Sequence, residues 1–448
     1  MVLCGLILLT VVLEALDFQT KPPRVHQHLD MPGPLPVITI NPHGQDIPGV
    51  SNDSGIQEAV KVDFNIADQD LQTQAMVHYR GNSSKWFDKK SMLVKLVDNK
   101  GNKDPQSLAG LPAHDEWVLN GPFLDRTLIR NYMAYNIAGE IMAYAPGVRF
   151  CELVVDDVYK GVYLIVESIA EDEARISLTK PEKNKSRTSY MVKLDRKGKG
   201  DHEINNFTNY TLELEGSAMD IIYPGRNSIT PERMAYIEAD ISKVEKLLYS
   251  YDLLGTKADY QDYIDIQAFA QYFIINEFFK NTDAGWFSTY YYKDIRGKIK
   301  PCVWDFNNMC NNYIDYAQDE AGFTMIDSPW FERLIRDEDF VDEIVSQYRT
   351  LRKGVLSEAY LLAYIDETVA YLGEAIDRNY EVWGYVFDLE QVDTLNYLIP
   401  VERNYTSYEQ ALEQLKTYVV ARGKWLDAHI DTLYQYTSAS KNVHLNTP

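Results

Sequence analysis

The sequence is short of basic residues. Its 448 residues include 44 Lys and Arg against 66 Asp and Glu, which gives a formal net charge of −22. A nucleic-acid-binding surface neutralises phosphates with an excess of Lys and Arg, so this balance argues against a nucleic-acid partner. Hydrophobic residues make up 45% of the chain and aromatic residues 12%. That composition is typical of a folded protein and not of an acidic disordered one.

Cysteine is also scarce. The four cysteines are Cys4, Cys151, Cys302 and Cys310, and no two of them have the spacing of a zinc site or of a redox Cys-x-x-Cys motif. Cys302 and Cys310 form a disulfide if their compartment is oxidising, and they stay buried free thiols if it is not. The sequence leaves both outcomes open.

An apolar run, MVLCGLILLTVVLEAL, opens the chain. It is short for a membrane span and resembles the apolar core of a signal peptide. We therefore predict export to the cell or spore surface or to the medium, through a cleaved signal or through an uncleaved anchor as the only membrane contact. A buried first strand or helix is the alternative. Because Pro and Gly cluster after this run, residues 1–50 are predicted to be leader and linker.

The remaining residues predict an α+β chain. Residues 51–180 alternate between apolar and polar residues as antiparallel strands do, and they include one helical stripe for which Asp125 is the predicted N-cap. Residues 181–448 are mainly helical, and we find no internal repeats. We predict two lobes, a strand-rich N-terminal lobe and a helical C-terminal lobe, with the active site in the cleft between them.

Two aspartates are candidates for a catalytic or metal-binding role. Asp283 follows the end of a long apolar helix, and Asp305 follows the short apolar strand KPCVW. Taken alone, each is more often a cap or a turn residue. A run of amides, however, follows the second aspartate (Asn307, Asn308, Asn311 and Asn312). Together these residues supply the carboxylate and amide oxygens that hold Mg²⁺ and orient an attacking hydroxyl in phosphoryl transfer.

The order of these features is that of a protein kinase, in which the metal-binding Asp precedes a Phe, as Asp305 precedes Phe306. The usual companions are missing, because neither a His-Arg-Asp motif nor a Gly-x-Gly-x-x-Gly loop occurs. If the chain is a protein kinase, the absence of these motifs makes it an atypical one.

The chain resembles the CotH family of spore-coat-type atypical protein kinases over about residues 57–430. The segments that carry the resemblance, in order, are YRGNSSKWFDKKSMLVKL, LDRTLIRNYMAYNIAGEI, GVYLIVESI, FIINEFFKNTDAGWFSTYYYKD, CVWDFNNMCNN and SPWFERLIRDEDF. The resemblance implies a secreted or surface protein with a reduced, two-lobed kinase-like fold. It also implies that ATP and Mg²⁺ or Mn²⁺ are the cofactors and that a Ser or Thr of a coat or surface protein is the acceptor.

By position in these motifs, the resemblance implies that Asp283 is the catalytic aspartate and that Asp305 is the metal-binding aspartate. Asn312 matches the Asn that ends the family's metal-binding element, so we assign it to the metal and the nucleotide. Lys95 is predicted by its order in the chain to reach the phosphates, with Glu140 as a candidate partner. The alternative for Lys95 is a stem that lies along the sheet with its ammonium in water.

The stretch Arg80-Gly81-Asn82-Ser83-Ser84 is predicted to replace the Gly-rich loop. Gly81 allows close backbone approach, Asn82 and Ser83 donate hydrogen bonds, and Arg80 supplies charge for phosphate oxygens. The alternative is a hairpin turn in which Arg80 makes a structural ion pair.

The chain departs from the family pattern at two positions, with Asn307 in place of Asp and Asn311 in place of Gly. The first change removes one negative charge and should weaken Mg²⁺ binding. A surface scaffold or adhesin that has lost catalysis is therefore the alternative to a kinase. For a kinase, the acidity of the chain predicts a basic, Ser-rich protein substrate.

Overall fold

The computed structural model describes residues 34–49, 58–81, 84–198, 202–211, 216–250, 260–393 and 396–441. The apolar run at the start of the chain, Asn82 and Ser83 lie outside these ranges. Among the helices within these described ranges, none combines the length and the apolar character that crossing a bilayer requires.

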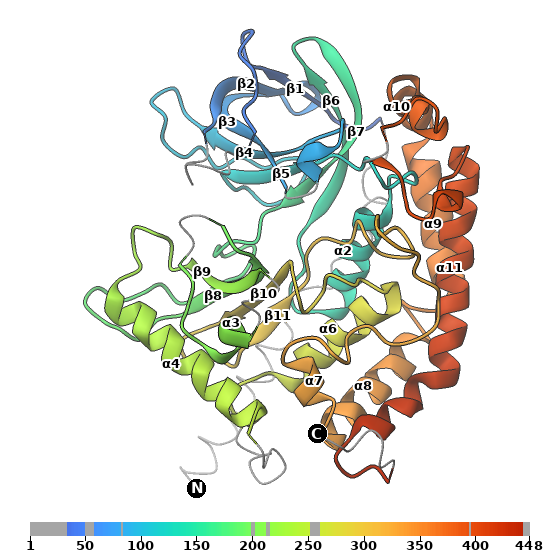
Figure 1. Cartoon of the computed structure of the whole chain (residues 1–448). Coiled ribbons are helices and arrows are strands. Elements are labelled where there is room, and N and C mark those ends of the chain that lie inside the picture. The colour runs from blue at the N-terminus through green and yellow to red at the C-terminus, as the bar shows by residue number, and fades with distance from the viewer. Residues whose placement is uncertain are drawn as a thin grey trace, which may run out of the picture.

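Seven strands close into a barrel, which lies at the top of Figure 1. Their order around the barrel is β1-β2-β3-β4-β5-β7-β6, and all neighbours are antiparallel except β1 and β6, whose parallel pairing closes the ring. The strands are β1 (Val37–Asn41), β2 (Val60–Ile66), β3 (Leu71–Arg80), β4 (Ser91–Val97), β5 (Glu116–Asn120), β6 (Val148–Val155) and β7 (Val158–Glu167).

Alternation along each strand separates the inside of the barrel from its outside. In β4, Met92, Val94 and Leu96 join the core of the barrel, while Leu93 packs against the larger core of the rest of the molecule. Successive side chains of a strand point to opposite faces, so the residues between them, including Ser91 and Lys95, face outward. The outer face of β4 is therefore the face from which the barrel contributes to a site.

A second sheet and most of the helices make up the rest of the molecule (Figure 1). The sheet has the order β11-β10-β8-β9, and its strands are β8 (Tyr190–Arg196), β9 (Ser217–Tyr223), β10 (Thr289–Lys293) and β11 (Lys300–Cys302). The helices are α2 (Arg130–Ile141), α3 (Phe207–Thr211), α4 (Pro231–Leu248), α6 (Ile266–Phe279), α7 (Phe331–Leu334), α8 (Glu338–Leu351), α9 (Glu358–Leu372), α10 (Ala375–Trp383) and α11 (Tyr408–His429). Short 3₁₀ turns are η1 (Ala67–Gln69), η2 (Ser84–Trp86), η4 (Gly384–Phe387), η6 (Val401–Arg403) and η7 (Ile430–Tyr436).

The helix predicted after Asp125 is α2, and the role of Asp125 differs from the prediction. The N-cap position belongs to Ile129, whose side chain makes no capping hydrogen bond. The Asp125 carboxylate instead accepts from the backbone N–H of Arg130 at 2.8 Å and pairs with the Arg130 guanidinium at 2.6 Å. The free N–H of the first helical turn is thus satisfied by an acid five residues upstream.

The prediction of a mixed α+β chain is confirmed, but the predicted two-lobed, atypical protein-kinase-like arrangement is wrong. The N-terminal strands form a closed barrel, and a four-stranded sheet lies in the part predicted to be mainly helical. Alternation predicts where strands occur but not which of them pair. The β1–β6 pairing that closes the barrel joins Ile38 to Leu153, far along the chain, and no local pattern encodes such a pair.

The prediction of a Cys302–Cys310 disulfide or of free thiols is resolved for this structure. Cys151, Cys302 and Cys310 are all buried, and none of them forms a disulfide within the described residues. Burial raises the pKa of the Cys310 thiol to about 12, so this thiol stays protonated and unreactive at neutral pH.

Candidate active site

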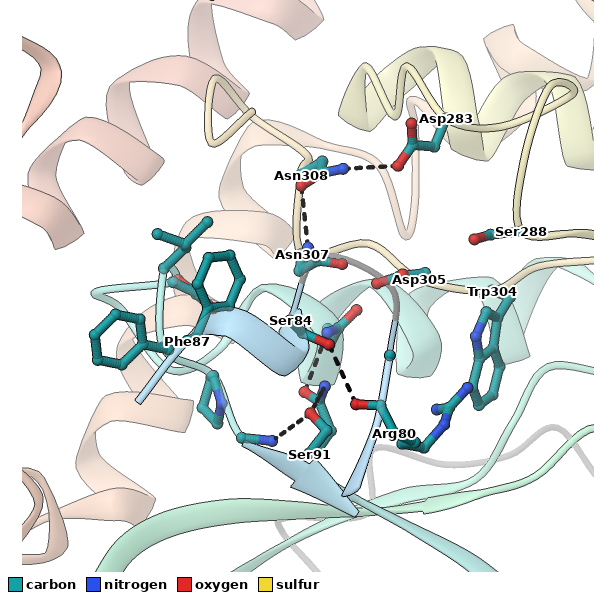
Figure 2. Close-up of a pocket in the computed structure, with 18 of the residues that line it drawn as sticks. Arg80, Ser84, Phe87, Ser91, Asp283, Ser288, Trp304, Asp305, Asn307 and Asn308 are labelled. Atoms are coloured by element: carbon teal, nitrogen blue, oxygen red, sulfur yellow. Dashed lines mark hydrogen bonds between the residues drawn. The ribbon is translucent and has the colours of Figure 1, made fainter. Parts of the chain in front are cut away.

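One pocket brings together residues of the barrel and of the second sheet with its loops (Figure 2). Apolar side chains line part of it: Phe87, Val118, Phe123, Leu124 and Val166. Five aspartates line it as well: Asp125, Asp195, Asp283, Asp305 and Asp315. The cations in the lining are Arg80 and Arg196. Figure 2 shows Phe87 on the side of the pocket away from Asp283 and Trp304, so the lining has an apolar side and a charged side.

Asp283 enters the pocket because α6 ends sharply. Lys280, the C-cap residue, adopts a left-handed conformation with φ of 50°, which turns the chain off the helix axis. The Asp283 carbonyl then accepts from the backbone N–H of Phe287 at 2.7 Å. Its carboxylate accepts from the side-chain amide of Asn308 at 2.8 Å, a bond drawn in Figure 2. The acid is therefore held in one orientation by a turn and an amide.

Asp305 follows β11 in a conformation that is unusual for a residue with a Cβ, with φ of 59°. Two side chains hold its peptide groups, since its N–H donates to the Tyr135 hydroxyl at 3.0 Å and its carbonyl accepts from Asn281 at 3.2 Å. The next N–H, of Phe306, donates to Asn131 at 2.7 Å. Backbone strain that the surroundings enforce in this way is a feature of functional sites.

Burial shifts the pKa of both acids upward. The pKa of Asp305 is raised to about 6 by burial, and the neighbouring charge of Asp283 adds to the shift while Arg80 opposes it. Burial also raises the pKa of Asp283, against the charge of Arg196 and the hydrogen bond from Asn308. Asp283 is near enough to raise the pKa of Asp305, and both acids line one pocket, so they share one site. Perturbed acids in a pocket are typical of catalytic or ligand-binding positions.

Each arginine of the pocket stacks on an aromatic ring. The Arg80 guanidinium lies 5.4 Å from the Trp304 ring, next to which Figure 2 shows it, and the Arg196 guanidinium lies 4.0 Å from the Phe287 ring. Within the described residues, neither arginine makes an ion pair with a carboxylate. Stacking fixes the planar guanidinium and leaves its N–H donors for another acceptor, for which phosphate oxygens are well suited.

Three predicted residues lie elsewhere. Lys95 pairs with Glu116 of β5 at 3.1 Å, and it lies four residues beyond Ser91 on the same face of β4, roughly 13 Å further from the pocket. Glu140 accepts from the Tyr360 hydroxyl at 2.6 Å, and the structure does not bring it to Lys95. Neither Lys95 nor Glu140 lines the pocket.

Asn312 is the third predicted residue that lies outside the pocket lining. It is 2% exposed, and its amide donates to the backbone carbonyl of Asn307 at 2.7 Å. It therefore supports the loop that carries Asn307 and is not part of the pocket lining. Of the predicted cofactor residues, the structure brings Arg80 to the two aspartates, while Asn82 and Ser83 lie outside the described residues.

Asn307 and Asn311, the two departures from the family pattern, have different structural meanings. Asn311 has φ of 61°, a conformation that Asn tolerates better than other residues with a side chain, so it can replace Gly there. Asn307 lines the pocket and donates to Asn308 at 3.0 Å, which in turn donates to Asp283. Its carbonyl oxygen Oδ1 is buried without a hydrogen-bond partner among the described residues.

Several pocket residues were not predicted from the sequence. Asp195 and Arg196 lie at the end of β8, and Tyr135 and Asn131 reach the pocket from α2. The Asp-Arg pair had a usable signal, because two charges directly after an apolar strand often mark a strand end at a site. Tyr135 and Asn131 had none, since their helix reads as an ordinary amphipathic one.

The donor set fits a divalent cation that is held in part by substrate. No group of three or more His, Cys, Asp or Glu side chains that could hold a metal occurs in the part of the chain that the structure describes. Asp283, Asp305 and the unpartnered Oδ1 of Asn307 offer oxygen ligands in one pocket. Mg²⁺ is usually bound by one or two carboxylates, waters and substrate phosphates, and it does not need a larger protein cage.

Comparison with protein-family models identifies the family. The family model described as CotH kinase protein matches residues 77–426, which is most of the chain and includes every described residue that lines the pocket. No curated protein matches the chain.

Proposed function

Because the chain belongs to the CotH kinase protein family, we propose that it is an ATP- and metal-dependent protein kinase that phosphorylates Ser or Thr hydroxyls. One observation carries the proposal. A single pocket is lined by two acids with raised pKa values, Asp283 and Asp305, and by two arginines without carboxylate partners among the described residues. Phosphoryl transfer needs an oriented acceptor, a metal and neutralised phosphate charge, and this pocket offers a residue for each.

Asp283 is the residue that orients the acceptor hydroxyl and takes its proton. Its carboxylate is fixed by Asn308, and its raised pKa makes it a better proton acceptor than an exposed aspartate. In the proposed reaction it accepts the hydroxyl proton while the acceptor oxygen forms a bond to the γ-phosphorus and the bond to the leaving ADP oxygen breaks. Alignment of the hydroxyl contributes as much as proton transfer does, because phosphoryl transfer depends mostly on positioning.

Arg80 and Arg196 would bind phosphate oxygens, and the apolar side of the pocket would hold the base. Asp305 would be the metal ligand, with Asn307 Oδ1 as a neutral second ligand. A bound Mg²⁺ or Mn²⁺ would neutralise the charge that develops on the phosphates. Lys95 and Asn312 have no part in this assignment, since neither lines the pocket.

An inactive surface scaffold is the second candidate, and the neutral Asn307 favours it. With one carboxylate fewer than the family pattern, the metal site is weaker, and a pocket that binds no metal–nucleotide complex has no phosphoryl group to transfer. The predicted export and the predicted basic, Ser-rich coat or surface protein as partner belong to both candidates. They rest on the start of the chain and on its acidity.

Transfer of labelled phosphate separates the two. We expect the purified protein, with γ-labelled ATP and Mg²⁺ or Mn²⁺, to label a Ser-containing basic protein, and we expect Asp283→Ala to reduce the rate by at least about 100-fold. The matched control is Asp431→Ala, which removes an exposed carboxylate paired with Arg349 far along the chain. Equal labelling by wild type and Asp283→Ala, or none by either, would reject the kinase. A thermal shift on adding ATP and metal then tells a nucleotide-binding scaffold from one that binds none.

A further inference from the structure

The connection between β3 and β4 carries part of the pocket and, at its end, a buried lysine. Ser84, Phe87 and Ser91 line the pocket, whereas Lys89 does not. The Lys89 side chain is 1% exposed, so its ammonium lies inside the protein. Lys is almost never fully buried unless it is paired, and a lysine in this position therefore needs an explanation.

Lys89 is held by an amide and two aromatic rings. Its Nζ donates to Oδ1 of Asn379 at 2.7 Å and lies 5.2 Å from the ring of Tyr163 and 5.9 Å from that of Trp383. No carboxylate bonds to it in the part of the chain that the structure describes, and burial lowers its pKa. A lysine held in this way makes few alternative contacts, so its position is tightly defined.

Asn379 and Trp383 belong to α10, which lies against the barrel at the upper right of Figure 1. Asn379 Oδ1 also accepts from the N–H of Val162 at 3.0 Å, and the Trp383 indole donates to the carbonyl of Lys160 at 2.8 Å. Between them, Gly161 has φ of 85°, and a Cβ there would come within 2.5 Å of Asn379 Oδ1. The glycine thus allows α10 to seat directly on β7.

The same helix also reaches the apolar side of the pocket. The Trp383 ring meets Phe123 edge-on at 6.0 Å, and Phe123 stacks on Phe87 at 5.7 Å. Phe87 and Phe123 both line the pocket. Trp383 therefore lies near both Lys89 and the pocket wall.

From these contacts we propose that Lys89 is a positioning residue. It joins the β3–β4 connection to α10 and so holds Phe87 and Phe123 at the separation that binds the base of the nucleotide. The identity of the ligand rests on the proposed function, and the role in holding the connection does not. α10, which lies almost 300 residues along the chain from the connection, is on this account part of the nucleotide site.

Hydrogen–deuterium exchange tests the positioning without any nucleotide. In Lys89→Met, which removes the ammonium and keeps a long apolar stem, we expect amides of residues 84–91 to exchange about tenfold faster than in the wild type. The control is Arg378→Met on the same helix. Arg378 donates to Glu152 of β6 at 2.9 Å. Its replacement by Met therefore loosens α10 from the barrel and removes no contact of the β3–β4 connection. Unchanged exchange in Lys89→Met, or an equal effect of Arg378→Met, overturns the proposal.

Nucleotide affinity tests the consequence. For Lys89→Met we expect the Kd and KM for ATP to rise about fivefold or more while kcat changes less than about twofold, since Asp283 and Asp305 are not touched. The control is Arg349→Met, which removes an exposed cation of α8 outside this network and should bind ATP as the wild type does. A Lys89→Met protein with a lower Tm but unchanged Kd has lost stability alone, and that result overturns the proposal.

The two proposals fail separately. If the wild-type protein binds no ATP, the proposed function is rejected, and the exchange comparison still decides whether Lys89 holds the connection. If ATP binds and is used but Lys89→Met behaves as the wild type in both assays, the proposed function stands and the positioning role is rejected.

Discussion

The surroundings of Asp305 disfavour the charged form of its carboxyl group. Its pKa of about 6 lies above the ordinary value, because burial and the charge of Asp283 both favour the protonated form. In the unfolded chain Asp305 loses its proton near pH 4, and in the folded chain near pH 6. Between these values the folded state holds more protons, so this group makes the protein less stable as the pH rises from about 4 to 6. Its effect is fully present above pH 6.

Asp305→Asn should therefore stabilise the metal-free protein. We expect the free energy of unfolding in EDTA to rise by about 1–2 kcal/mol at pH 7.5 and to be almost unchanged at pH 4, where the native carboxyl is already neutral. The figure allows for the solvent that reaches this side chain. Urea unfolding at the two pH values measures it. A variant that is no more stable than the wild type at pH 7.5 would contradict the raised pKa.

Asn307 offers a second prediction at this scale. Because Asn307 has an unpartnered Oδ1 and lines the same pocket as the two acids, Asn307→Asp should restore a charge to the cation site and lower the Kd for Mn²⁺ about tenfold. Calorimetric titration with Mn²⁺ alone measures this without any need for activity. Asn312→Asp is the control, since Asn312 is buried outside the pocket lining. Tighter binding in Asn312→Asp and not in Asn307→Asp would return the ligand role to Asn312.

Single residues were predictable where a secondary-structure element delivers them. Asp283 and Asp305 follow an apolar helix and an apolar strand, and this position together with the amides after Asp305 marked them as candidates. Lys95 was assigned by its order along the chain, and order does not say how far along a strand the pocket lies. Tyr135 acts through a hydroxyl that holds the backbone of Asp305, and no sequence pattern announces such a contact.

At the scale of elements, the end of α6 is fixed by α11. The Arg422 guanidinium is fully buried and bonds the carboxylate of Glu277 at 2.7 Å and its backbone carbonyl at 2.9 Å. The same carboxylate accepts from the N–H groups of Thr324 and Met325. Glu277 lies in the last turn of α6, so this network anchors the helix end from which the loop that carries Asp283 departs.

Removing Arg422 should leave a buried carboxylate without its cation. Arg422→Leu is expected to lower the free energy of unfolding by roughly 3–5 kcal/mol. The matched control is Arg349→Leu, because the Arg349–Asp431 pair is more than half exposed on both sides and should contribute less than about 1 kcal/mol. Chemical denaturation measures both. Similar losses for the two variants would contradict the role given to the buried pair.

Individual helices and strands were largely predictable, because apolar periodicity of 3.6 or 2 reports a face that is buried. Residues 51–180, predicted to hold antiparallel strands and one helix, contain β2 to β7 and α2. The closure of the barrel was not predictable, since it depends on pairing between strands that lie more than 100 residues apart. The docking of α10 on β7 could not be predicted either, because these two elements also lie far apart along the chain.

At the scale of the whole molecule, we propose that charge directs the choice of acceptor. The chain carries a net charge of −22, and five aspartates line the pocket with two arginines. A field of one sign over a site raises the encounter rate with ligands of the opposite sign, and salt screens it. ATP is repelled by the same field, so the arginines and the metal have to compensate locally.

We therefore expect Ser peptides flanked by Lys or Arg to be phosphorylated about tenfold faster than Ser peptides flanked by Glu at low ionic strength. The preference should shrink at about 0.5 M salt, because the Debye length then falls well below the size of the site. Steady-state kcat/KM for the two peptides at both salt concentrations measures it. Equal rates on the two peptides at low salt would count against field-directed selection.

The most direct measurement is a crystal structure with a non-hydrolysable ATP analogue and Mn²⁺. We expect anomalous density for Mn²⁺ at Asp305, the triphosphate between Arg80 and Arg196, and Asp283 facing the γ-phosphate. We also expect the base against Phe87 and Phe123. A nucleotide bound away from this pocket, or a pocket that holds the nucleotide with Asp283 turned away from the γ-phosphate, would contradict the proposed function.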